Sequence, residues 1–556
     1  MTISFIWRFM PSTKRQTHEK GKSLSRPHGV RPRAIFAALL LFLTAVLSSC
    51  TEVVDNVDTT PVLDPWDGAE KANALDSITD VDVEMRGVFI ASVYNIDFPS
   101  KKGLSSKELA AELDDIVETA ASFGINTIFF QVRPSSDALY DSKIFPISEY
   151  LTGGESSSLP DGFDPLDYII KAAHKAGLRV HAWVNPLRVT RGSEANPKTD
   201  PEALAPTNPA RLNPKLCVAY ADGSLYYDPG LPEVRALIAA GVREIAANYD
   251  VDGIIFDDYF YPYPVKDANG NIIDFDDAET YAEYSSGFDN IADWRRNNIN
   301  LMIKSCYEAI KDESEDCLFG VAPFGIWQNS DGSNGGSATS GFDAYSLIYC
   351  DALAWVKGGY VDYIAPQIYW SFDKESAPFD VLADWWNAAL DGTSVKLYIS
   401  LAAYKYGTDE WSGAGEREEI TSQINYAREL LTYKGCILYG YSNLKKDIDG
   451  VATETKAVFS DLIYYTSPVS TGKQMELYAE PPVISEQAET ATVTAYGISD
   501  PAHTVEYWGE NDPTGAGISR KKDGSFTLTL QLHRGENIIE FRTAYGKYVY
   551  AINVGT

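Results

Sequence analysis

The 556-residue chain contains few histidines and few cysteines, six of each. No two histidines are spaced as HxH or HExxH and no two cysteines as CxxC, so the ligand spacings common in zinc sites are absent. The chain also lacks a GxSxG motif and a Cys–His–Asn signature, which disfavours acyl-hydrolase chemistry. We therefore expect no metal and no other cofactor.

Five cysteines follow Cys50, and this odd number without paired spacing does not indicate a disulfide framework. Cys350 and Cys436 fall in a predicted helix and a predicted strand, where cysteine usually serves as a small buried hydrophobe. A bridge between Cys306 and Cys317 is left as an alternative.

Positive charge is scarce as well. The chain has 47 lysines and arginines against 78 aspartates and glutamates, a formal net charge of −31. Nucleic acid is not an expected partner, because binding it depends on neutralising its phosphates. The same charge would repel polyanionic glycans from a site that is not locally neutral, so neutral or zwitterionic sugars fit better.

Long apolar runs are limited to residues 34–43, a stretch shorter than the roughly 20 residues of a membrane-spanning helix. This stretch follows a basic segment and precedes Leu47-Ser-Ser-Cys50, the pattern of a bacterial lipoprotein signal. We predict a signal peptide over 1–49, a lipid on Cys50 that holds the protein at the membrane, and a tether over 50–85. The expected location is the cell envelope, as an outer-membrane lipoprotein facing the periplasm or the medium. An ordinary signal peptide or an uncleaved anchor is the alternative.

Between residues 86 and 466, apolar runs alternate with helical patterns eight times, which predicts the α/β class and a (β/α)8 TIM barrel. The first helix is opened by the capping box Ser105-x-x-Glu108. An open doubly wound sheet is the alternative, but no Gly-rich phosphate loop follows the first strand. The expected strands are 86–94, 127–132, 180–184, 254–256, 319–322, 363–369, 396–402 and 436–439.

After Thr466 the helical pattern stops, and residues 467–478 are expected to be a linker. Alternating apolar and polar residues then predict sandwich strands over 479–556, a small C-terminal all-β immunoglobulin-like domain without the disulfide signature. Such a domain either binds carbohydrate or serves as a spacer, and the spacer role is favoured.

The most informative segment is Asp252–Pro262, an apolar strand that ends in two adjacent carboxylates and several aromatic rings. Catalytic groups of such barrels lie where the strands end, which is the position of Asp257 and Asp258. Glycoside cleavage needs one protonated and one ionised carboxyl group. Because side chains alternate along a strand, only one of the pair is expected to face the barrel axis unless the strand has already bent. Asp137, after the second strand, is the candidate partner; a structural role is the alternative for all three.

Amide and aromatic side chains at other strand ends suit the hydroxyl groups and flat C–H faces of sugars. The candidates for holding a sugar are Arg133, Asn185, Tyr259, Gln367, Tyr369, Trp370 and Tyr404. For Arg133 the alternative is a salt bridge at the top of the barrel, and His181 is expected to be a hydrogen-bonded core residue.

These positions carry motifs that resemble the glycosyl-hydrolase-like 10 family. The motifs include Arg86-Gly-Val, Gln131-Val-Arg-Pro134, Ala182-Trp-Val-Asn-Pro186, Tyr227-Asp-Pro-Gly230, Asp252–Pro262 and Pro366-Gln-Ile-Tyr-Trp370, and the resemblance spans residues 86–466. It implies an envelope lipoprotein that hydrolyses a glycan of N-acetylated hexosamines, with peptidoglycan strands stripped of their peptides as the leading substrate.

The general acid is left open. In more distantly similar barrels a nucleophile occupies the position of Asp257 and a Glu follows the fifth strand, whereas this chain has Ala322-Pro-Phe-Gly-Ile-Trp327 there. The candidate acids are Asp137, Asp258, Asp373 and Glu410. Two rival hypotheses are a glycan-binding lipoprotein that does not hydrolyse its ligand and a glycosidase of nutrient polysaccharide. The sequence does not predict the oligomeric state or the anomeric outcome.

Overall fold

The computed structural model describes residues 81–460 apart from 157, 409 and 412–417. It also describes 70–71, 73–74, 464–466, 476–479, 490–498, 505–509, 512–518, 525–543 and 546–554. The predicted signal peptide, Cys50 and most of the predicted tether lie outside the described residues.

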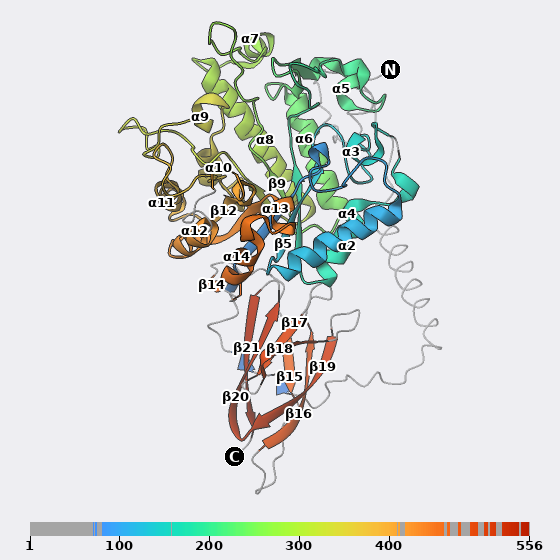
Figure 1. The fold of residues 1–556 in the computed structure, drawn as a ribbon, viewed down its shortest axis with the longest axis vertical. Coiled ribbons are helices and arrows are strands. Elements are labelled where there is room, and N and C mark those ends of the chain that lie inside the picture. Colours follow the sequence, from blue (N-terminus) through green and yellow to red (C-terminus); the bar gives the residue numbers. More distant parts are fainter. Residues whose placement is uncertain are drawn as a thin grey trace, which may run out of the picture. The chain divides into compact units, whose positions relative to one another are not determined.

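Eight parallel strands close into a barrel in which every strand pairs with its neighbours along the chain (Figure 1). The last strand pairs with the first through Gly435 opposite Met85, which completes the ring. The predicted (β/α)8 barrel is therefore confirmed. Its strands are β4 (Met85–Ile90), β5 (Thr127–Arg133), β6 (Arg179–Val184), β9 (Gly253–Phe256), β10 (Leu318–Val321), β11 (Tyr363–Ile364), β12 (Lys396–Ala402) and β13 (Tyr433–Tyr439).

Helices cover the outside of the strands (Figure 1), and several of them, including α2, α4, α8 and α10, begin at a residue whose side chain caps the helix. Ser105 forms the predicted capping box with Glu108, and the Asp164 side chain accepts from the backbone of Leu166 and Asp167. The main helices are α2 (Ser106–Ser122), α4 (Pro165–Lys175), α6 (Pro232–Asn248), α8 (Ile291–Glu313), α10 (Ala352–Gly358), α11 (Phe379–Leu390), α12 (Glu419–Arg428) and α14 (Val451–Val458). Shorter ones are α3 (Glu149–Thr152), α5 (Pro209–Leu212), α7 (Ala278–Tyr284), α9 (Ala344–Leu347) and α13 (Tyr441–Lys445).

The cysteines of the barrel are free, so the alternative of a Cys306–Cys317 bridge does not hold. Cys306 lies on α8 and Cys317 just before β10, and both are buried. Cys436 is buried in β13 as predicted, whereas Cys350 is buried in the segment before α10 and not in a helix.

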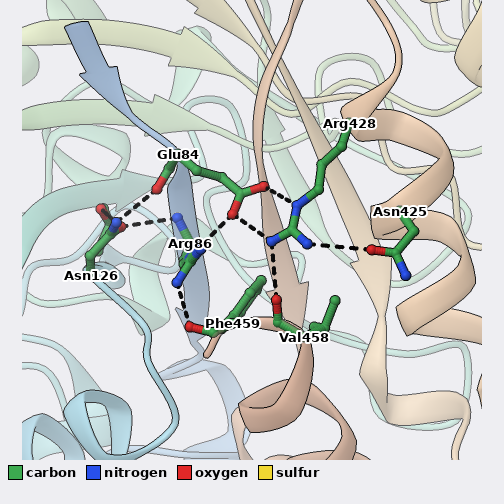
Figure 2. A network of polar contacts seen from close by, with 8 residues as sticks. Glu84, Arg86, Asn126, Asn425, Arg428, Val458 and Phe459 are labelled. Atoms are coloured by element: carbon green, nitrogen blue, oxygen red, sulfur yellow. Dashed lines mark hydrogen bonds and ion pairs between the residues drawn. The ribbon is translucent and has the colours of Figure 1, made fainter. Parts of the chain in front are cut away.

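A buried ion network joins the first strand to the last helices (Figure 2). Glu84 accepts from Arg86 Nε at 2.9 Å and from Arg428 Nε and Nη2, both at 2.8 Å. Arg86 Nη1 donates to the Phe459 carbonyl oxygen at 2.6 Å, and its backbone N–H donates to Asn126 Oδ1 at 3.0 Å. Arg86 of the Arg86-Gly-Val motif therefore links the first barrel strand to the end of the last helix. The motif does not lie at the strand ends where the catalytic groups are expected.

The C-terminal strands form two sheets, ordered β1-β15-β16-β19 and β18-β17-β20-β21-β2. Their buried side chains, among them Leu477, Phe526 and Phe541, form one apolar cluster separate from the barrel core. The strands are β1 (Glu70–Lys71), β2 (Asn73–Ala74), β15 (Glu476–Ala479), β16 (Thr490–Ile498), β17 (Val505–Gly509), β18 (Asp512–Gly517), β19 (Ser525–His533), β20 (Gly535–Thr543) and β21 (Gly546–Val554).

Two segments predicted as connections contain strands. Within the expected tether 50–85, β1 pairs with β15 and β2 pairs with β21. Within the same segment, β3 (Val81–Val83) pairs with β14 (Tyr464–Thr466). The expected linker 467–478 contains most of β15. These strands are two to four residues long, too short for an alternation of apolar and polar residues to reveal them.

Candidate active site

Asp257 and Asp258 lie just beyond the end of β9, which stops at Phe256. Asp257 accepts from Trp183 Nε1 at 3.0 Å and from Asn185 Nδ2 at 3.2 Å to each of its oxygens. Trp183 belongs to β6, and Asn185 follows directly after it. The neighbouring strand therefore supplies the donors that orient the first carboxylate.

Asp258 turns to a different set of partners. The hydroxyl of Tyr263 donates to Asp258 Oδ2, and Gln367, which follows β11, provides a further side-chain hydrogen bond. Because the strand has ended, the alternation of side chains no longer separates the two carboxylates, and both lie in one site. This is the bent arrangement that the sequence analysis left open.

Burial dominates the electrostatics of both carboxylates. It raises the pKa of Asp257 to about 7, with the Arg188 charge acting in the opposite direction and the Asp258 charge adding to the rise. The pKa of Asp258 is also raised by burial, while hydrogen bonds from Tyr263 and Gln367 act to lower it. Two buried, interacting carboxylates of unequal environment can hold one proton between them near neutral pH.

Arg188, to which the sequence analysis assigned no role, lies beside this pair. Its Nε and Nη2 donate to the Pro134 carbonyl oxygen at 3.1 and 3.0 Å, and its backbone N–H donates to Asn185 Oδ1 at 3.2 Å. Its Cζ lies 4.9 Å from the ring centroid of Tyr259. The Asn185-Pro-Leu-Arg188 segment could have identified Arg188 as a site residue, because it places a cation directly after β6, the strand beside β9.

Aromatic rings extend the site from the later strands. The ring centroid of Tyr369 lies 5.8 Å from that of Tyr404 and 6.2 Å from that of Tyr439, with the second pair stacked. Trp370 packs edge-on against Phe324 at 5.4 Å. The predicted aromatic residues Tyr369 and Tyr404 therefore lie together, and Tyr439 at the end of β13 is an additional member that the sequence analysis did not name.

Asp137 is buried in its own set of contacts on the loop after β5. Ser148 Oγ donates to its Oδ2 at 2.5 Å, and the Ser135 backbone N–H donates to its Oδ1 at 3.1 Å. Burial and the nearby charges of Glu155 and Glu149 raise its pKa to about 7. These contacts hold a loop together, and none of them involves the aspartate pair.

The two other candidate acids lie at the surface. Glu410 is 56% exposed and pairs with Lys405 at 3.0 Å, and Asp373 is exposed. Both differ in this exposure from the buried aspartate pair.

Arg133 is directed away from the sugar-binding candidates. Its Cζ lies 3.6 Å from the ring centroid of Phe145, and a Cβ placed on Gly241 of α6 would lie 2.3 Å from its Nη1. It therefore fills the space between β5 and the helix layer, and none of its guanidinium nitrogens has a hydrogen-bond partner among the described residues. A shift in strand register between Gln131 and Arg133 accounts for this, because such a bulge changes the direction of the side chains that follow it. His181, by contrast, is a buried core residue with Nδ1 2.8 Å from the Tyr363 hydroxyl, as expected.

In the described part of the chain, no three His, Cys, Asp or Glu side chains are grouped to hold a metal ion. No helix in that part is both long and apolar enough to cross a membrane.

The model of the glycosyl hydrolase-like 10 family matches residues 84–412, more than half of the chain. The chain belongs to this family. The match includes the aspartate pair, Asn185, Gln367 and the Tyr369–Tyr404 cluster. It confirms the resemblance seen in the sequence and the expected class of enzyme, a glycoside hydrolase.

Two relatives and one solved structure show the extent of the similarity. The chain is 40% identical over 372 residues to the glycosyl hydrolase YngK of Bacillus subtilis (strain 168), covering 66% of this chain and 70% of the relative. It is 35% identical over 425 residues to the glycosyl hydrolase DigH of Escherichia coli (strain K12), covering 74% of this chain and 93% of the relative. The PgaB (BpsB) glycoside hydrolase domain from Bordetella bronchiseptica aligns with a TM-score of 0.44 and 12% identity, over 70% of this chain and 100% of that one.

Proposed function

We propose that this glycosyl hydrolase-like 10 member cleaves glycans that contain N-acetylhexosamine, with peptide-stripped peptidoglycan strands as its substrate. The observation that carries the proposal is the buried pair Asp257 and Asp258. Trp183 of β6 and Asn185 donate to Asp257, whereas Tyr263 and Gln367, which follows β11, are the partners of Asp258. Glycoside hydrolysis requires a proton donor for the leaving oxygen and an ionised carboxylate. The pair offers both functions within one site.

The different environments of Asp257 and Asp258 suggest which carboxyl group is the general acid and which is the nucleophile or base. Asp257 has a pKa of about 7 and can carry the proton near neutral pH, so it is the proposed general acid. Asp258 accepts hydrogen bonds from the Tyr263 hydroxyl and from Gln367, and both donors favour its ionised form. It is the proposed nucleophile or base. Asp137 is proposed to orient the loop after β5 and not to supply the acid.

The sugar would lie against the neighbouring polar and aromatic groups. Asn185 and Gln367 present amides beside the two carboxylates, and Tyr259, Tyr369 and Tyr404 present ring faces and hydroxyl groups. Trp370 would extend this surface. Such groups suit the alternating polar and C–H faces of a hexosamine.

The proposed location follows from the sequence. A lipoprotein signal that ends at Cys50 would attach the protein to the bacterial outer membrane, facing the periplasm or the medium. The C-terminal strands are proposed to form an immunoglobulin-like sandwich that serves as a spacer, in line with their two sheets and single apolar cluster.

Product analysis tests this function. The chain from Thr51 onward is incubated with intact peptidoglycan and with strands stripped by an amidase, and the released oligosaccharides are identified by mass spectrometry. Products from stripped strands alone support the proposal. Silence on both substrates would contradict it and would favour a nutrient polysaccharide or binding without cleavage.

A further inference from the structure

Two arginines on the loop after β6 lie beside the aspartate pair without a carboxylate partner. Arg188 is buried and Arg191 is half-buried, and among the described ion pairs neither side chain has a carboxylate within 4.0 Å. By comparison, Arg243 contacts both Asp312 and Glu313. The positive charge of Arg191 is therefore not paired with a carboxylate in the described part of the chain.

Tyr259 locates these arginines relative to the catalytic pair. The pKa of its hydroxyl is raised by burial and by the charges of Asp258 and Asp257, and those of Arg188 and Arg191 act to lower it. Arg188 Cζ lies 4.9 Å from the Tyr259 ring centroid. Arg191 follows Arg188 by three positions on the same loop and therefore lies near the part of the site that Arg188 and Tyr259 form, and the action of all four charges on Tyr259 agrees with this position.

The surroundings of Arg191 are aromatic. Its Cζ lies 6.0 Å from the ring centroid of Tyr94, whose side chain is 56% exposed, and the Tyr94 hydroxyl is its hydrogen-bond partner. Tyr226 also lies close to both arginines, but its hydroxyl is taken by Asp222 at 2.6 Å. Asp222 forms no ion pair with either arginine in the described structure. A substrate could therefore reach Arg191 without displacing a salt bridge.

Arg188 and Arg191 differ in what they do for the aspartates. Arg188 acts to lower the pKa of both Asp257 and Asp258, and its guanidinium is held in place by the Pro134 carbonyl oxygen. Arg191 does not figure among the principal charges that shift either carboxylate.

We propose that Arg191 binds a carboxylate carried by the substrate, the free lactyl group of a muramic acid residue that has lost its peptide. This inference rests on the proposed function and names the part of the substrate that determines specificity. A peptide-bearing residue carries an amide at this position, which offers no negative charge to the guanidinium. The local pair of arginines also explains how a chain of net charge −31 can accept an anionic sugar.

The test compares two forms of the same stripped strands, one with free lactyl carboxylates and one with these groups converted to methylamides. For the unaltered enzyme we expect kcat/KM to be about tenfold or more higher on the free acid, because a charge-assisted contact is lost with the amide. Arg191→Gln should abolish this preference mainly through KM, and Arg191→Lys should restore part of it. Lys215→Gln, which removes one charge from an exposed position, is the matched control and should keep the preference.

A second measurement needs no variant. In the unaltered enzyme, KM for the free-acid strands should rise with ionic strength, whereas KM for the methylamide strands should stay constant. Equal cleavage of both forms, or a preference that survives in Arg191→Gln, would overturn the inference and leave the proposed function standing. Absence of cleavage of either form would overturn the proposed function, and the inference with it.

Discussion

The indole Nε1 of Trp183 donates a hydrogen bond to Oδ2 of Asp257 over 3.0 Å, although 74 positions of the sequence separate the two residues. The contact exists because β6 and β9 are neighbours in the barrel, with Trp183 opposite Ile255. One strand thereby fixes the orientation of the carboxyl group that follows the next. This contact gives a direct way to test the role of Asp257.

Trp183→Phe should move the pH dependence of the reaction. The lost donor favoured the ionised form of Asp257, so its pKa should rise above the present value of about 7. If Asp257 is the general acid, the descending limb of the kcat/KM profile should shift to higher pH while kcat falls. A shift of the ascending limb would instead identify Asp257 as the base, and an unchanged profile would contradict a role in either sense. Trp385→Phe, whose indole donates to the Gly335 carbonyl oxygen, is the control.

Asp257→Asn and Asp258→Asn should each lower kcat by about 10² to 10⁴-fold. Their folding stability should remain the same or increase above neutral pH. Burial raises the pKa of both groups, so ionising either carboxyl group lowers the folding stability. This loss of stability is absent below the unfolded pKa of about 4 and grows as the pH rises toward the folded pKa. Steady-state kinetics together with thermal unfolding at two pH values check both statements. Full turnover in both variants would end the assignment.

The barrel could be predicted from the sequence because each of its strands is a short apolar run. Positions such as Ile254 and Phe256 are fully buried, and their periodicity differs from that of the helices between them. The pair Asp257–Asp258 was found for a related reason, since a change from apolar to charged residues marks the end of a strand. The strands and the position of the aspartate pair at the end of a strand could therefore be predicted from the order of residues.

The direction of a side chain is a different matter. Arg133 was expected in the sugar site because it is a polar residue at the end of a predicted strand, but the register shift between Gln131 and Arg133 turns it toward Phe145 and α6. The partnership of Asp258 with Tyr263 depends on a bend after the strand that has no periodic signal. A bulge or bend involves only one or two residues of the sequence, yet it sets the direction of the side chains that form the site.

Asp137→Asn should separate a structural role from a catalytic one. The side chain accepts from Ser148 and Ser135 and does not contact the aspartate pair, so kcat should stay within about tenfold of the unaltered enzyme. The thermal midpoint should fall modestly, because Ser148 and Ser135 donate to different oxygens of Asp137 and the amide of Asn keeps only one acceptor oxygen. Ser148→Ala, which removes the same contact from the other side, should reproduce this pattern. A loss of kcat as large as that of Asp257→Asn would instead identify Asp137 as the missing acid.

Glu84→Gln should destabilise the barrel without altering its chemistry. The side chain of Glu84 is fully buried and lies between Arg86 and Arg428, which are 2% and 16% exposed (Figure 2). Removing its charge takes away the carboxylate that lies between two largely buried guanidinium groups, a change that typically costs about 3–5 kcal/mol. The free energy of unfolding from urea titration should fall by that order, with kcat per folded molecule unchanged. Glu194→Gln, at an exposed position, should change stability by less than about 0.5 kcal/mol. Equal effects of the two substitutions would show that the network in Figure 2 does not hold the last helices to the first strand.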